Sequence, residues 1–269
     1  MSYHQSLTTT SSVNLCDTAM VHEPGFSTVR RYTDEILEQS DKTAAWVSGR
    51  LDAIVPTCPT WRAADLIAHL IDVHWFWRTI VEEELTAPPA AERRPVRPHD
   101  GDLIATYVAG ATSLAEVLTH ARQQQSVWTW STLSTVSFIT RHQVQEAAVH
   151  AYDAAAVAER PDEWHMPSDL ADDAIEEFCT YSVSARVRHE SPRAPLGAPL
   201  VLHDPTSSST WTLRDRGPDA LVWRRGDANV GTRVSAPSPT LLLWLYQRVT
   251  LEVDDEPIVR RFREFTSTD

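Results

Sequence analysis

The sequence predicts an α+β protein, in which a bundle of helices is followed by a smaller unit that mixes helices and strands. Two observations support this class. Apolar residues recur at helical spacing in four long segments of the first 160 residues. Beyond that point, short strand-like runs alternate with turn-forming residues. Hydrophobic residues make up 42% of the 269 residues, which is enough to build a core.

The first part of the chain is predicted to be a flexible arm and a four-helix bundle. Residues 1–24 are rich in Ser and Thr and show no periodicity. Residues 86–99 hold four prolines and are predicted to be a long loop. Thr60 is the expected N-cap of the second helix. Four helices joined by loops indicate a bundle over residues 25–163. The helices are expected from Gly25 toward Ile54, over Trp61–Glu84, over Asp102–Gln124 and over Ser137–Glu159.

The second part, residues 164–269, is predicted to be a small α+β domain. It should open with a helix over Ser168–Glu190, with Ser168 as its N-cap. Turn-rich segments then separate the expected strands. The strands are expected at Leu200–His203, Thr210–Leu213 and Ala220–Arg224, and the last two helices at Thr240–Arg248 and Glu256–Phe265.

Composition excludes several classes of protein. With 24 basic and 37 acidic residues, the formal net charge is -13, and an acidic surface repels nucleic-acid phosphate. No run of 18 apolar residues predicts a membrane span, and the polar start of the chain does not resemble a signal peptide. The three cysteines form no C-x-x-C pair, which fits a reducing cytoplasm. No feature of the sequence sets an oligomeric state.

Three residues of the predicted bundle are candidate metal ligands. Glu146 and His150 are four residues apart and share one face of the fourth helix. His69 lies in the middle of the second helix. Two imidazole nitrogens and a carboxylate oxygen form a common ligand set for a divalent metal such as zinc, and three protein ligands leave one position open. On spacing alone, a structural i,i+4 pair and a core histidine are the more frequent interpretation.

Three segments resemble the mycothiol-dependent maleylpyruvate isomerase family, whose bundle is of the DinB-like metal-binding type. Segment 59–70, PTWRAADLIAHL, resembles the family signature P-x-W-x-x-x-D-L-x-x-H-L. Segment 146–153, EAAVHAYD, resembles E-x-x-x-H-x-W-D, with Tyr152 in place of the usual Trp. Segment 241–248, LLLWLYQR, resembles an element of the family's C-terminal domain, which is similar in shape to sterol carrier proteins.

The resemblance implies a site and a cofactor. It places the family's metal ligands at His69, Glu146 and His150. It also assigns a role in activity to Arg248, whose guanidinium would suit the carboxylate of a substrate or thiol. The alternative for Arg248 is a surface residue at a helix C-terminus. The family usually has Gly where this chain has Gln247. The implied co-substrate is mycothiol, which points to an actinobacterial host.

The expected chemistry is activation of this thiol as a thiolate, which then adds to an electrophilic small molecule. In S-transfer the sulfur stays attached, whereas in an isomerase of the maleylpyruvate type it adds and leaves again. Few cationic groups are predicted near the metal, with Arg248 and Arg78 the candidates, so S-transfer is the first hypothesis and isomerisation the second. The alternative from another class is a non-catalytic protein that binds a metal or a lipid.

Overall fold

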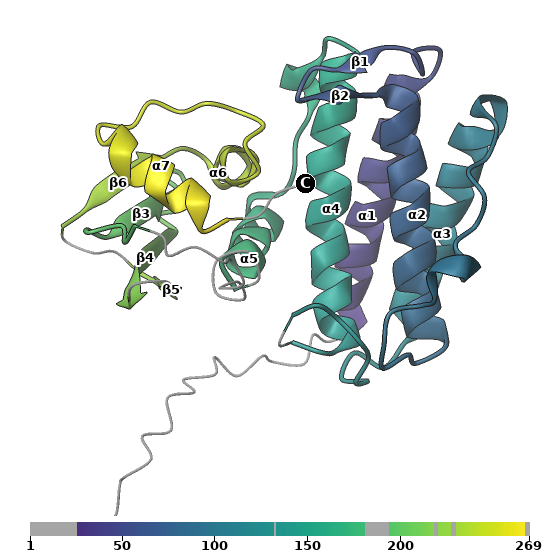
Figure 1. Cartoon of the computed structure of the whole chain (residues 1–269), viewed down its shortest axis with the longest axis horizontal. Helices are drawn as coiled ribbons and strands as arrows, with labels where there is room; N and C mark the ends of the chain where they lie inside the picture. Colours follow the sequence, from purple (N-terminus) through teal and green to yellow (C-terminus); the bar gives the residue numbers. More distant parts are fainter. Residues whose placement is uncertain (1–25, 132, 181–193, 218–219, 227–229, 267–269) are drawn as a thin grey trace, which may run out of the picture.

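The computed structural model describes residues 26–131, 133–180, 194–217, 220–226 and 230–266 (Figure 1). These residues form a helical bundle and a smaller unit that contains a sheet, so the predicted α+β class is confirmed. The predicted arm over residues 1–24 lies outside the described part of the chain, and the domain boundary near residue 164 stays a prediction.

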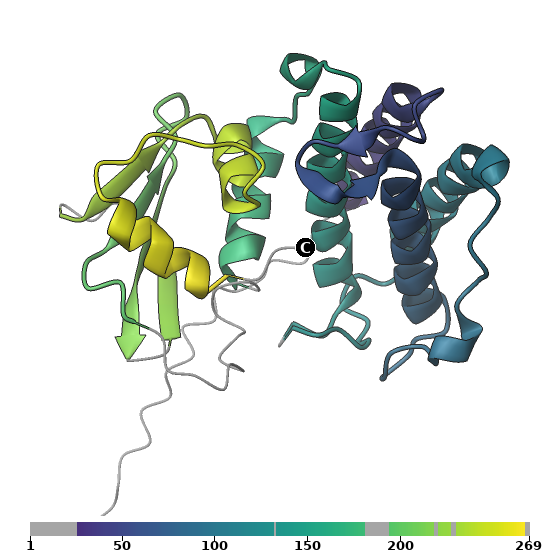
Figure 2. The ribbon, with the colours of Figure 1, turned by 45° about the horizontal axis from the view of Figure 1, so that its top comes forward.

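The bundle consists of four long helices, and α4 is its most deeply buried member. Both views place α4 beside the second unit of the chain (Figures 1 and 2). Small alanine side chains line much of α4, which lets neighbouring helices approach closely. Helix α4 packs on α1 and α2 inside the bundle and on α5 at the opposite side. The bundle helices are α1 (Phe26–Val47), α2 (Ala63–Glu82), α3 (Leu103–His120) and α4 (Val136–Val157), and the long loop before α3 carries η1 (Ala91–Arg93) and η2 (Asp100–Asp102).

A short hairpin between α1 and α2 was not predicted. Helix α1 ends at Val47, before the expected end near Ile54, because Gly49 takes a φ of 73° that stops the helix. Strands β1 (Ile54–Val55) and β2 (Cys58–Arg62) follow and pair antiparallel. The prediction of Thr60 as N-cap is wrong, because Thr60 belongs to β2. Arg62 holds the cap position, and its backbone N–H donates to Asp65 Oδ2 at 3.0 Å.

The second unit is a four-stranded sheet with three helices packed against it. The strand order is β5-β4-β3-β6, with β3 antiparallel to β4 and parallel to β6. Strand β6 was missed in the sequence, because it has four residues and only one of them is apolar. A hydrophobic cluster joins the sheet to the helices. The elements are η3 (Pro161–Glu163), α5 (Ser168–Phe178), β3 (Leu200–His203), β4 (Thr210–Gly217), β5 (Ala220–Arg225), β6 (Thr232–Ser235), α6 (Ser238–Leu245) and α7 (Glu256–Glu264).

Three predicted helix ends need correction. Pro167, not Ser168, precedes α5, which ends at Phe178; residues 181–193 of the expected helix lie outside the described residues. Helix α6 ends at Leu245, so Arg248 lies beyond it in the chain. Gln247 adopts a φ of 61°, the left-handed conformation that glycine takes at low cost. The turn before Arg248 is therefore formed with glutamine. Among the described helices, none has the length and apolar character that a bilayer crossing requires.

Candidate metal centre

Helices α2 and α4 bring His69, Glu146 and His150 together. One ligand atom from each residue lies within 4.8 Å of the other two. Glu146 Oε1 is 3.1 Å from His69 Nε2 and 3.4 Å from His150 Nε2. The carboxylate thus lies between the two imidazoles, and the three donor atoms face one another between α2 and α4. Their side chains are 26%, 18% and 5% exposed, so the cluster is shielded on the His150 side and more open at His69.

The orientation of the His150 ring is set by a buried carboxylate. His150 Nδ1 donates to Asp153 Oδ2 at 2.9 Å, which leaves Nε2 to face Glu146. Asp153 itself is fully buried and accepts three further hydrogen bonds. The Arg248 guanidinium binds it through two contacts of 3.0 Å each, and Thr57 Oγ1 donates at 2.5 Å. A chain of hydrogen bonds therefore runs from the second unit of the protein to a candidate metal ligand.

These contacts shift the pKa values of both carboxylates and of His150. Burial alone would disfavour the charged imidazolium, but hydrogen bonds to Asp153 and Glu146 outweigh it and raise the pKa of His150 to about 9. Burial also opposes ionisation of Asp153, yet His150 and Arg248 lower its pKa to about 2. For Glu146, bonds from His150 and His69 overcome burial and hold its pKa well below the usual value. Without metal, the cluster is a protonated histidine held by two carboxylates.

Divalent metal binding should therefore release a proton. A metal needs the lone pair on His150 Nε2, which the protonated ring lacks. Because the folded-state pKa of His150 is about 9, zinc should displace about one proton at about pH 7, and fewer as the pH rises through about 9. Calorimetric titration of zinc in buffers of different ionisation enthalpy measures this number. A proton count near zero at about pH 7 would contradict the assigned protonation state.

The hairpin β1–β2 forms a wall of the cluster. The Trp61 ring lies 5.0 Å from the ring of His69 and 6.3 Å from that of His150, measured between centroids. Cys58 Sγ accepts a hydrogen bond of 3.4 Å from Arg248 Nη2. The contacts of Thr57 and Cys58 could not be predicted from the sequence, because nothing in their spacing relates them to Asp153 or Arg248.

Arg248 lies beside the cluster and forms an ion pair with Asp153. Its Nη1 donates to the Tyr246 carbonyl oxygen at 2.9 Å, and its side chain is only 5% exposed. The alternative of a surface arginine at a helix end is therefore wrong. Its predicted binding of a carboxylate from a substrate or thiol stays a prediction. His142, four residues before Glu146 on α4, is not in the cluster, and its Nδ1 lies 3.2 Å from Glu177 Oε1.

A buried two-histidine, one-carboxylate cluster in a four-helix bundle defines a candidate metal-binding class. Within this class, residues 33–155 match the model of the mycothiol maleylpyruvate isomerase N-terminal domain. The match covers most of the helical bundle, which is similar to this domain family.

Solved structures share the fold over most of the chain. The crystal structure of a mycothiol-dependent maleylpyruvate isomerase is similar with a TM-score of 0.53 and 12% identity, covering 84% of this chain and 91% of that one. A histidine-to-alanine mutant of a mycothiol-dependent maleylpyruvate isomerase gives a TM-score of 0.54 and 11% identity, covering 84% and 92%. At these identities the likeness establishes the fold. No curated protein matches the sequence.

Proposed function

We propose that this protein is a metal-dependent enzyme that activates a low-molecular-weight thiol, mycothiol, for addition or S-transfer to an electrophilic small molecule. The observation that carries the proposal is the cluster of three ligand atoms within 4.8 Å of one another. The family of the bundle supports mycothiol as the thiol. The side chain of His69 is partly exposed beside the cluster, and an enzyme needs such an opening for its substrates to reach the metal.

The donor set of the cluster fits a divalent metal, with zinc as the proposed ion. Two imidazole Nε2 atoms and one carboxylate oxygen would hold it, and three protein ligands leave a position for a thiol. When bound, such a metal lowers the pKa of a thiol in contact with it. Asp153 holds His150 in the tautomer that presents Nε2 to the cluster. Arg248 acts in this proposal through Asp153, as a positioning residue.

The fate of the sulfur separates two outcomes. In S-transfer, the thiol sulfur forms a bond to an electrophilic carbon and remains there. In isomerisation of the maleylpyruvate type, the sulfur adds to one carbon of a cis double bond, the remaining single bond rotates, and the same sulfur leaves. The second outcome is the alternative function, and the names of the two structures with a similar fold support it. A cytoplasmic location accompanies both, because a reduced thiol pool is required.

Titration calorimetry of mycothiol into the zinc-loaded protein tests the proposal. The wild type should bind the thiol, whereas His150→Ala should lose both its zinc and the thiol. The matched control is His120→Ala, because His120 is an exposed histidine of α3 far from the cluster in sequence and fold. Zinc content is measured for each variant alongside binding.

The outcomes separate the competing functions. A zinc-loaded wild type that ignores mycothiol would rule out the proposed co-substrate and favour a non-catalytic metal protein. A wild type that holds no divalent metal would overturn the proposal altogether. If mycothiol binds, incubation with a cis-alkene acid distinguishes the outcomes, because a covalent thiol adduct indicates S-transfer and a trans-alkene product indicates isomerisation.

A further inference from the structure

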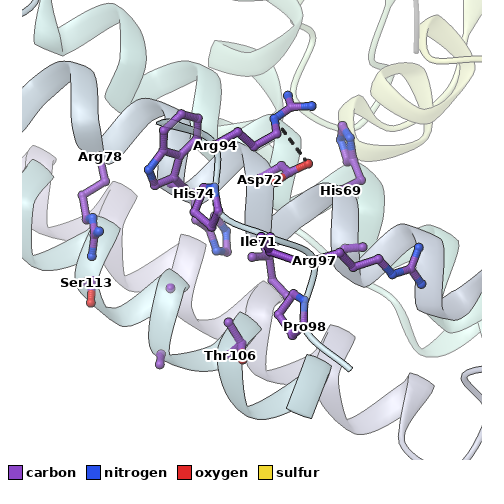
Figure 3. Close-up of a pocket in the computed structure, with 16 residues that line it drawn as sticks. His69, Ile71, Asp72, His74, Arg78, Arg94, Arg97, Pro98, Thr106 and Ser113 are labelled. Atoms are coloured by element: carbon purple, nitrogen blue, oxygen red, sulfur yellow. Dashed lines mark ion pairs between the residues drawn. The ribbon is translucent and has the colours of Figure 1, made fainter. Parts of the chain in front are cut away.

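A cavity of about 530 Å³ lies on the face of α2 that is turned toward α3. Helices α2 and α3 form two of its sides, and residues 94–98 of the long loop cover the third (Figure 3). Its volume falls within the range of sites for small organic ligands. His69 is the one residue that it shares with the metal cluster, whose other two members are on α4.

The lining of this cavity is positively charged, although the chain as a whole is acidic. Arg78, Arg94 and Arg97 line it, and Asp72 is the one carboxylate among the lining residues. Counted over the lining residues alone, two positive charges remain, while Glu82 and Asp65 outside the lining lie within ion-pair distance of Arg78 and Arg97. Figure 3 shows Arg78 at one end of the cavity and Arg97 toward the other, with His74 between them. Local charge opposite to the net charge attracts anions to one place on the surface.

Two of these arginines keep their hydrogen-bond donors unused. Arg78 Nε lies 3.6 Å from Glu82 Oε2, and Arg94 Nε lies 3.7 Å from Asp72 Oδ2. Both distances exceed those of hydrogen bonds, and within the described ranges neither arginine donates one. Each guanidinium carries five N–H groups suited to paired bonds with a carboxylate. Arg97 is different, because its Nη1 donates to Asp65 at 2.8 Å.

A buried imidazole supplies an independent sign of a ligand. His74 lines the cavity with only 3% of its surface exposed. Its Nδ1 is buried and has no hydrogen-bond partner in the described part of the chain, which costs free energy unless a ligand or water supplies one. Gly110 faces this nitrogen from α3, and an added Cβ there would lie 3.3 Å from it. A glycine at this position keeps the space beside His74 open.

From this geometry we infer a second ligand site, which takes a small organic anion with a flat apolar body. The anionic group pairs with the Arg78 or Arg94 guanidinium, and the His74 imidazole supplies a further polar contact. The apolar walls come from Trp75 and Ile71 on α2 and from prolines of the covering loop. Trp75 offers an indole surface for a flat ring. This site adjoins the metal cluster at His69, but its anion-binding groups are not members of the cluster and do not require that the cluster be catalytic.

Naphthalene-2-carboxylate is a suitable probe, measured by calorimetric titration into the full-length, zinc-loaded protein. The wild type should bind it saturably, and neutral naphthalene-2-methanol should bind on the order of tenfold more weakly. Ala109→Trp should abolish binding, because Ala109 is an exposed residue of α3 that lines the cavity. Ala105→Trp is the matched control, because Ala105 is exposed one turn earlier on α3 and does not line it. The double variant with Arg78→Gln and Arg94→Gln should weaken binding on the order of tenfold.

The same titration with His150→Ala separates this site from the metal cluster. Binding should persist in this variant, even when its zinc is lost. Loss of binding there would assign the probe to the metal and overturn the inference. Equal binding by Ala109→Trp and wild type would place the probe elsewhere, and equal binding of the neutral alcohol would remove the role of the arginines. No detectable binding by the wild type would also overturn it.

Discussion

Glu146→Gln should lose its divalent metal and, with it, thiol-dependent turnover. The carboxylate lies 3.1 Å and 3.4 Å from the two histidine Nε2 atoms, so as a candidate ligand it would contribute both a ligand atom and a negative charge. Glutamine keeps the shape of the side chain and removes that charge. Metal affinity should fall by more than the roughly 10–100-fold that is typical when a residue that only orients a ligand is lost. Without metal, no group in the cluster would lower the pKa of the thiol.

Zinc affinity measured by competition with a chelator checks this expectation. The matched control is Glu116→Gln, because Glu116 is an exposed carboxylate of α3. Its affinity and turnover should equal those of the wild type. Circular dichroism shows whether both variants keep their helix content. Unchanged zinc affinity in Glu146→Gln would rule out this carboxylate as a ligand.

Arg248→Met should cost about 3 kcal/mol of unfolding free energy, at the lower end of the range for a broken buried ion pair. Arg248 and Asp153 are 5% and 0% exposed, so water cannot replace the lost contacts. The loss stays at the lower end because protonated His150 still pairs with Asp153 in the metal-free protein. A less constrained Asp153 should also weaken zinc binding by about 10–100-fold through His150.

Denaturant unfolding and zinc competition measure the two effects. Arg31→Met is the control, because Arg31 pairs with Asp169 between α1 and α5 while its side chain is 52% exposed. Its loss should cost less than about 1 kcal/mol, as is typical of exposed pairs. An Arg248→Met variant as stable as Arg31→Met, with unchanged zinc affinity, would contradict the positioning role.

The four bundle helices could be predicted from the spacing of apolar residues in the sequence, but the residues at which they end could not. The apolar spacing of α2 extends over five turns and marks its buried face in the sequence. The hairpin before α2 could not be predicted from the sequence. Pro56 and Pro59 are typical of a segment that ends a helix, and the two strands are only two and five residues long. Strand β6 depends on its parallel pairing with β3, which lies 32 residues away in the chain. Such pairing leaves no local pattern.

The candidate ligands were also placed by the sequence, but their surroundings were not. Glu146 and His150 share a helix face at a spacing of four residues, and the structure brings them to His69. Asp153 follows His150 by three residues, and in the structure its carboxylate contacts His150 Nδ1. Its pairing with Arg248 spans 95 residues and two units of the fold. Few cationic groups were predicted near the candidate ligands. The structure adds Arg94, which lies on the proline-rich loop and lines the cavity that also contains His69.

The bond between Arg248 and Asp153 limits how the two units of this protein can be recombined. A chimaera that joins this bundle to a foreign C-terminal unit would inherit all three candidate metal ligands. Unless the new unit supplies an arginine at the same place, a buried carboxylate beneath the ligands would lose its partner. Exchange of the C-terminal unit alone should therefore destabilise the bundle, unless the incoming unit carries an arginine at the position of Arg248.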